Sequence, residues 1–224
     1  MNILSVETST KNFSLAVARG GRIVASRNIY LNKVLSSSII PAIEKILSKT
    51  NMSLNRLQCF AVGLGPGSFT SLRVGLATVK ALSFATQKPV IGISSLDVLA
   101  MNVKDSYQGS LCVICDARRS LVYGCNYEMQ TGHLRRTSKY FLTDSPTLLK
   151  KIKKKTLFLG DGIKLLKEDL EKNPQAALAD ERYWYPQAKH LCGLAWPRAR
   201  RRDFDDAARL VPIYLYPDDC QVGK

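Results

Sequence analysis

A glycine-rich loop that runs directly into a long apolar helix is the feature that most restricts the fold of this chain. Residues 63–86 read GLGPGSFTSLRVGLATVKALSFAT. Gly63, Gly65 and Gly67 permit backbone angles that other residues resist, and Pro66 fixes one dihedral between two of them. The stretch therefore predicts a strand that ends in a shaped loop, with a helix beginning at once after it.

The first turn of this helix is a candidate anion site. Ser68 and Thr70 are predicted to cap its orphan amides, which also attract negative groups. A Walker loop, however, needs Lys-Ser or Lys-Thr after its last glycine, and here Ser68-Phe69 follow Gly67. The loop alone therefore gives a nucleotide site only weak support.

The helix itself is apolar nearly all round. Between Leu72 and Thr86 its only charges are Arg73 and Lys80, and small residues alternate with large apolar ones. Such a helix must be covered on more than one face. Two interpretations remain open at this point: a central core helix, or a helix held between its own sheet and a partner subunit.

Length and composition indicate an ordinary globular protein. With 224 residues, 46% of them hydrophobic, the chain suits one large or two small domains. It has no apolar run of about 18 residues and no signal-like start, so we expect a cytoplasmic protein with no membrane span. The six cysteines lie mostly in apolar segments, which favours reduced core thiols over disulfides. No metal site is expected from the CxxC of Cys112 and Cys115, because its two side chains face opposite sides of a strand.

The net charge of +15 points to a polyanionic partner such as RNA. Two clusters carry much of the excess. Each is either a solvated face or a nucleic-acid contact, and together they favour proximity to nucleic acid. One cluster comprises Lys150, Lys151, Lys153, Lys154 and Lys155, and the other Arg198, Arg200, Arg201 and Arg202.

Apolar periodicity predicts a duplicated α/β unit. The segment LCVICDARRSLVYGCNYE at 111–128 repeats the pattern of ILSVETSTKNFSLAVARG at 3–20: a strand ending in an acid, a polar turn and a second strand. We therefore expect two βββαβα-type subdomains with mixed sheets, at residues 1–104 and 105–224. The predicted strands are 2–7, 13–19, 22–30, 57–64, 89–93, 111–128 (two strands), 132–141, 156–161 and 210–217, and the predicted helices are 33–49, 70–86, 95–103, one starting at Ser145-Pro146, one ending near 172, and 186–200.

Local signals leave some helix starts open. Pro41 either kinks the helix at 33–49 or marks a start capped by one of the three serines 36–38. Ser94 or Ser95 is expected to cap the helix that ends near residue 103.

A carboxylate at the end of each first strand is the layout of actin-like ATPases and sugar kinases, whose two strand-turn-strand hairpins grip phosphate. The first hairpin, Glu7-Thr8-Ser9-Thr10, offers hydroxyls. The second continues from Asp116 into Ala117-Arg118-Arg119, with bulky cations where glycines are required. Only two histidines, His133 and His190, are present, so a histidine metal site lacks ligands and no triad can be assembled around a GxSxG elbow. A Ser or Cys nucleophile paired with one distant histidine stays open, although nothing in the sequence favours it. We expect a vestigial phosphate loop at Glu7, Thr8, Ser9 and Thr10, with no catalytic residue and no cofactor. A small ATPase or kinase-like protein is the alternative.

The stretch GLGPGSFTSLRVG resembles the TsaB (YeaZ) family, whose pattern there is G-x-GPGSFT-G-[LV]-R-x-G. The resemblance extends to ETST at the start, to PVIGISSL at 89–96, to DAR at 116–118 and to PIYLYP at 212–217. It spans nearly the whole chain and is loosest over 130–205. Glu7 in place of Asp, Ser71 in place of Gly, and Val34-Leu35-Ser36 in place of a His-Ser or His-Thr pair depart from the pattern.

The resemblance implies a double RNase H-like fold and a non-catalytic subunit of the bacterial machinery that makes N6-threonylcarbamoyladenosine at position 37 of tRNA. It implies a heterodimer with a catalytic TsaD-like paralogue, a TsaE-like ATPase that joins the assembled pair, and tRNA bound through the complex. Docking would use the helices at 33–49 and 70–86, and exposed apolar surface there predicts a homodimer when the partner is absent. The expected interface residues are Ile39, Ile43, Ile46, Leu72, Gly75, Leu76, Thr78, Val79 and Leu82, and the expected tRNA contacts are Lys150, Lys151, Lys153, Lys154 and Lys155.

Overall fold

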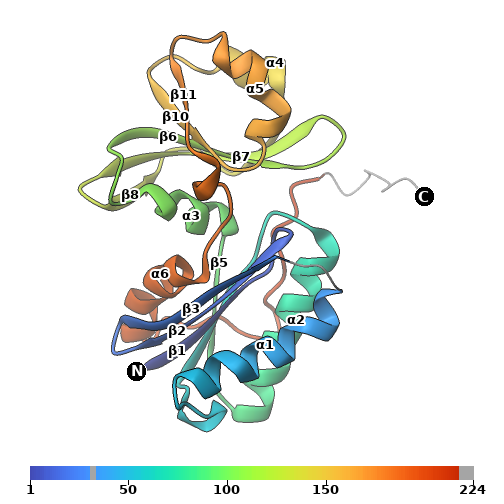
Figure 1. Cartoon of the computed structure of the whole chain (residues 1–224), viewed down its shortest axis with the longest axis vertical. Helices are drawn as coiled ribbons and strands as arrows, with labels where there is room; N and C mark the ends of the chain where they lie inside the picture. Colours follow the sequence, from blue (N-terminus) through green and yellow to red (C-terminus); the bar gives the residue numbers. More distant parts are fainter. Residues whose placement is uncertain (31–33, 217–224) are drawn as a thin grey trace. The chain divides into compact units, whose positions relative to one another are not determined.

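The computed structural model describes residues 1–30 and 34–216, and they form two compact units (Figure 1). The first unit holds residues 1–102 and 185–212, and the second holds 103–184 together with 213–216 of the described chain. The sequence-based division at 104/105 assigned the whole later chain to the second subdomain. The structure corrects this for residues 185–212, because a helix in that segment covers the first sheet.

The first unit is built on a mixed five-stranded sheet in the order β3-β2-β1-β4-β5. The hairpin predicted at Gly20-Gly21 is confirmed, and both glycines have positive φ angles, 60° and 85°. β4 and β5 add in parallel beside β1, each after a helical crossover. The strands are β1 (Asn2–Glu7), β2 (Asn12–Arg19), β3 (Arg22–Tyr30), β4 (Cys59–Gly63) and β5 (Val90–Ile93).

Helices cover both faces of this sheet. α1 (Leu35–Lys49) and α2 (Phe69–Thr86) lie together on one face, and α6 (Ala188–Arg200) lies on the other (Figure 1). Alternate strand residues divide accordingly, with Leu4 and Val6 facing α1 and α2, and Ile3 facing α6. The remaining short elements of this unit are α3 (Ser95–Ala100) and the 3₁₀ turns η1 (Leu54–Arg56) and η2 (Met101–Val103), although η2 crosses the boundary at residue 102.

One helix start that the sequence left open is decided, and one predicted cap is corrected. α1 begins at Leu35 and contains Pro41, so the serines at 36–38 do not cap a later start. The hydroxyls of Ser37 and Ser38 instead donate to the Val34 carbonyl. At α2, Ser68 occupies the N-cap position without a side-chain cap, because its hydroxyl pairs with that of Ser71 at 3.1 Å. Thr70 lies within that helix.

The second unit repeats the order of the first. Read in reverse, its sheet order β8-β7-β6-β10-β11 corresponds to β3-β2-β1-β4-β5 of the first sheet, and β9 is an additional strand that pairs with β7. The duplicated RNase H-like α/β fold is thereby confirmed. The strands are β6 (Gly109–Asp116), β7 (Leu121–Gln130), β8 (His133–Arg136), β9 (Phe141–Asp144), β10 (Thr156–Leu159) and β11 (Ala176–Leu178), and the helices are α4 (Ser145–Lys150), α5 (Ile163–Glu171) and the 3₁₀ turn η3 (Glu181–Tyr183).

Two strands predicted for the later chain are wrong, whereas the helix start at Ser145 is confirmed, with Asp144 as its N-cap accepting from the Thr147 amide. The strand predicted at 132–141 is split into β8 and β9, which both pair with β7. Residues 210–216 form no strand, whereas residue 217 lies outside the described chain.

The segment after α6 follows the free edge of β5 instead. Asp205 bridges Val90 and accepts from the Gly92 amide, and Arg198 pairs with both Asp203 and Asp205. Arg198, one member of the predicted arginine cluster, therefore joins α6 to the segment that follows it. Within residues 1–30 and 34–216, no helix is long and apolar enough to cross a membrane.

Candidate functional site

The turn after β1 is closed by its own carboxylate. Glu7 is fully buried, and its Oε1 accepts from the Ser9 amide at 2.8 Å. The Ser95 hydroxyl lies 2.9 Å from Oε2. Burial raises the pKa of Glu7 above its usual value, against hydrogen bonds from Ser9 and Ser95 that lower it. The sequence left Ser94 or Ser95 as the cap of α3; Ser94 takes that role, and the contact of Ser95 with Glu7 was not predicted.

Three glycines make room for this buried turn. A Cβ at Gly63 would overlap the Glu7 carboxylate, and one at Gly67 would overlap the Ser9 carbonyl. A Cβ at Gly75 would overlap the Thr8 hydroxyl. Thr8 is fully buried, and its Oγ1 has no hydrogen-bond partner in the described chain. The glycine loop and α2 therefore accommodate the β1–β2 turn, rather than a space that a phosphate could enter.

The backbone donors of the loop are also occupied by the chain. The Ser9 amide binds Glu7, the Gly65 amide donates to the Ser95 hydroxyl at 3.0 Å, and the Ser68 amide donates to the Ser9 carbonyl at 2.8 Å. A phosphate loop needs such amides to face the ligand. Of the predicted loop residues, only Thr10 is partly exposed, and its hydroxyl bonds to the backbone of Asn12.

The corresponding turn of the second unit is open. Asp116 is exposed, accepts from the Arg118 amide and donates its own amide to Asp161 Oδ1 at 3.1 Å. Burial raises the pKa of Asp161 above its usual value. Arg118, Arg119 and the following serine have φ angles of 67°, 51° and 58°, in the left-handed region that favours glycine.

Most of the residues predicted for docking are buried in the core of the first unit. Seven of the nine are buried in the folded chain, where α1 and α2 pack on their own sheet or, at Gly75, on Thr8. Only Thr78 and Leu82 are partly exposed. The buried residues are Ile39, Ile43, Ile46, Leu72, Gly75, Leu76 and Val79.

The outer face of α2 is nevertheless apolar. Ala77, Ala81 and Ala85 follow one another at helical spacing and are exposed, and Phe84 beside them is 81% exposed. On α1, Ile40 is exposed as well, at 42%. The residues predicted from the sequence lie mostly on the buried side of these helices, whereas the exposed apolar residues lie on their outer side. Alternating small and large residues could have indicated it, since small exposed residues let another helix approach closely.

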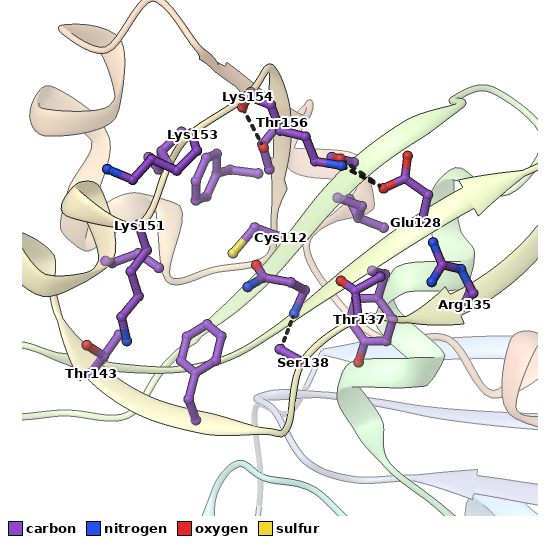
Figure 2. Close-up of a pocket in the computed structure, with 18 residues that line it drawn as sticks. Cys112, Glu128, Arg135, Thr137, Ser138, Thr143, Lys151, Lys153, Lys154 and Thr156 are labelled. Atoms are coloured by element: carbon purple, nitrogen blue, oxygen red, sulfur yellow. Dashed lines mark hydrogen bonds and ion pairs between the residues drawn. The ribbon is translucent and has the colours of Figure 1, made fainter.

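The basic cluster lies at a cavity of the second unit. Lys151, Lys153 and Lys154 line it, together with Arg135 of β8 (Figure 2). The other two predicted tRNA contacts, Lys150 and Lys155, are exposed and do not line it.

Comparisons with known proteins agree on one family. A family model described as TsaD, tRNA N6-adenosine threonylcarbamoyltransferase, matches residues 31–215. The tRNA threonylcarbamoyladenosine biosynthesis protein TsaB of Bacillus subtilis (strain 168) is 30% identical over 220 residues, which cover 96% of this chain and 94% of that protein. TsaB of Escherichia coli (strain K12) is 32% identical over 130 residues, covering 57% of this chain and 55% of its own.

Solved structures lead to the same family. YeaZ from Pseudomonas aeruginosa superposes with a TM-score of 0.82 at 25% identity, covering 96% of this chain and 99% of that one. The activator of the 2-hydroxyisocaproyl-CoA dehydratase from Clostridium difficile, solved with bound ADPNP, has a TM-score of 0.52 at 12% identity and shares the fold alone. The chain thus belongs to the TsaB (YeaZ) family of proteins involved in the biosynthesis of threonylcarbamoyladenosine in tRNA.

Proposed function

We propose that this chain is a scaffold and activator: it binds a catalytic TsaD-like paralogue and enables that partner to transfer the threonylcarbamoyl group to adenosine 37 of tRNA. The observation that carries the proposal is the exposed apolar face of α2, which consists of Ala77, Ala81, Phe84 and Ala85. We call it the docking face. In this proposal the chain works in the cytoplasm, a TsaE-like ATPase joins the assembled pair, and tRNA is bound by the complex.

The docking face has the properties of a helix–helix interface. Its alanines permit close approach, and burying Phe84 in a partner would contribute roughly 1.5–3 kcal/mol before association costs. The two charges of α2 border this face and are held by other residues of the chain. Arg73 lies over the ring of Phe69 at 3.8 Å, and Lys80 donates to the Ala208 carbonyl at 3.2 Å. Without the partner, the same face favours self-association of the chain.

The closed β1–β2 turn supports a non-catalytic role. Glu7 has its hydrogen bonds filled by Ser9 and Ser95, and three loop amides are bound internally. Nucleotide hydrolysis by an actin-like protein needs a turn that admits phosphate. We therefore prefer the scaffold to the small ATPase or kinase alternative. Calorimetry of the isolated chain with ATP and magnesium tests this preference, and micromolar binding would reverse it.

The main test places one negative charge on the docking face. Ala81→Glu is expected to abolish capture of the co-expressed TsaD-like paralogue, because a carboxylate would be buried against an apolar partner. Gly193→Glu is the matched control: it adds the same charge at an exposed helical site on α6, on the opposite face of the sheet, where a Cβ meets nothing within 4 Å. Circular dichroism confirms that both variants fold. Full capture by a folded Ala81→Glu variant would refute the docking face.

A further inference from the structure

A cavity of about 660 Å³ opens in the second unit, and its volume suits a small organic ligand. It lies over β6, β7 and β10 and is bordered by the connection from α4 to β10. Figure 2 shows Lys151 and Lys153 on one side of Cys112, with Glu128 and Arg135 on the other. The cavity belongs to one unit, so its walls are fixed by a single sheet and its flanking segments.

The residues at the base of the cavity form two rows across the strands, as the pairing of the strands shows. Ser110 of β6 is paired with Thr156 of β10 and with Glu128 of β7, which is in turn opposite Arg135 of β8. This row is polar throughout. Two residues further along β6, Cys112 is paired with Phe158 and with Asn126. All these residues line the cavity, so a polar row and a more apolar row lie side by side.

The rim carries an excess of positive charge. Glu128 is the only carboxylate among the lining residues, and it is neutralised by Lys154 at 3.1 Å and bound by the Ser110 hydroxyl at 2.9 Å. The Lys154 hydrogen bond is the main reason that the pKa of Glu128 lies below its usual value. Arg135, Lys151 and Lys153 form no ion pair with a carboxylate of the described chain. The four cations of the lining, Arg135, Lys151, Lys153 and Lys154, against this one carboxylate leave a net excess of three positive charges for an anionic ligand.

The inner wall suits a flat ring with polar edges. Phe141 lines this wall, and its ring packs directly against Gly124, where an added Cβ would overlap it. Phe158 and Leu148 add apolar surface. The side-chain amide of Asn126 makes no hydrogen bond to the described chain, and an amide can pair with the edge of a base.

We propose that this cavity binds an unpaired nucleotide of RNA, with the base against Phe141 and Asn126 and the adjoining phosphates on Arg135, Lys151 and Lys153. Stacking on aromatic rings and cationic contacts to the backbone are how proteins hold single-stranded RNA. A duplex presents phosphates but keeps its bases stacked inside, so it would leave the inner wall unused. The site goes beyond the proposed function, because it lies in the second unit and does not depend on the docking face.

The lysine run provides its own matched control. Lys151→Gln combined with Lys153→Gln removes two charges at the cavity, and Lys150→Gln combined with Lys155→Gln removes two charges from the same run away from it. Binding of a fluorescent single-stranded RNA oligonucleotide to the full-length chain is measured by anisotropy at fixed salt. The cavity variant is expected to lose at least about tenfold in affinity and the control less than about threefold, because charge-assisted hydrogen bonds are worth more than diffuse charge.

A second variant separates base contact from phosphate contact. Asn126→Ala removes the side-chain amide without adding a charge, so it should weaken single-stranded binding several-fold while leaving duplex binding unchanged. Equal losses in the two lysine variants, equal wild-type affinity for the duplex of the same sequence, or no binding of single-stranded RNA would each overturn the site. Ala81→Glu is expected to retain RNA binding, so failure of the cavity and failure of the docking face give different results.

Discussion

The two halves of the chain share a strand order but treat the turn after their first strand in opposite ways. In the first half, Glu7 is buried and bound by Ser9 and Ser95. In the second half, Asp116 is exposed, and the left-handed backbone at Arg118 and Arg119 holds bulky side chains. The two turns therefore differ in kind: the first is sealed by its own carboxylate, and the second is open and carries bulky cations.

The carboxylates that stabilise the two turns come from different strands. Glu7 ends β1 and reaches toward Gly63 at the end of β4. In the second half, Asp161 follows β10 and reaches back to the Asp116 amide at the end of β6. The first arrangement depends on glycines that admit buried side chains, so it should tolerate substitution poorly. The second is partly solvated and should tolerate change.

The largest effect is expected at the contact between α2 and the sealed turn. Gly75→Ala should lower the free energy of unfolding by about 1–3 kcal/mol, because the new Cβ would overlap the buried Thr8. Gly193→Ala is the control, with nothing within 4 Å of the added atom. It should raise the free energy of unfolding by up to about 1 kcal/mol through helix propensity. Urea unfolding followed by circular dichroism measures both.

A double mutant sharpens this test. Thr8→Ala removes a hydroxyl that has no hydrogen-bond partner in the described chain, so it should cost little by itself. In that background Gly75→Ala should lose much of its penalty, since the two nearest atoms, Oγ1 and Cγ2 of Thr8, are gone and only the Cβ at 3.0 Å remains. Strict additivity of the two substitutions would show that the overlap does not cause the destabilisation.

The buried carboxylate gives the next effect, in the pH dependence of stability. The pKa of Glu7 is raised in the folded chain from its usual 4.5, so the folded state binds its proton more tightly than the unfolded state. Stability from this group is complete at acidic pH and is lost as pH rises above about 4.5, with a slope of at most about 1.4 kcal/mol per pH unit. Glu7→Gln removes that slope and should be more stable than the wild type near pH 7.

Glu44→Gln on α1 is the control for this effect, because Glu44 is exposed. The three proteins are compared by urea unfolding between about pH 5 and pH 8, because carboxylates and histidines change the free energy of unfolding in this range. Parallel pH profiles for wild type and Glu7→Gln would show that Glu7 is charged at no cost and that the turn is less sealed than its burial indicates.

Local pattern was sufficient to predict most of the fold. The duplicated strands, the hairpin at Gly20-Gly21 and the helix after the glycine loop follow from short-range periodicity and turn chemistry. The packing of α6 on the first sheet could not be predicted in this way, because nothing local in residues 185–212 indicates which sheet they cover. The predicted strand at 210–217 had the right apolar alternation, but the edge of β5 is instead bridged by Asp205.

The candidate site was harder to predict, because it depends on which face of a helix is covered. α2 is apolar nearly all round, so periodicity could not separate the core residues Leu72, Leu76 and Val79 from the exposed Ala77 and Ala81. The contact of Ser95 with Glu7 joins residues 88 positions apart and has no local signature. The cavity likewise combines residues from five strands, helix α4 and two connecting segments.

The smallest effect is expected at the open turn. Arg119 has a φ of 51°, a conformation that costs free energy for any residue with a Cβ, and its side chain is exposed. Arg119→Gly should therefore raise the free energy of unfolding by up to about 1 kcal/mol, the strain relieved being partly offset by the greater freedom of glycine when unfolded. Arg201→Gly is the control, because Arg201 is an exposed arginine with a φ of −84° and should lose stability on the same change. Urea unfolding that gave equal losses for both variants would mean that the second turn is no more strained than an ordinary helix end, and the contrast between a sealed first turn and a strained second one would then rest on burial alone.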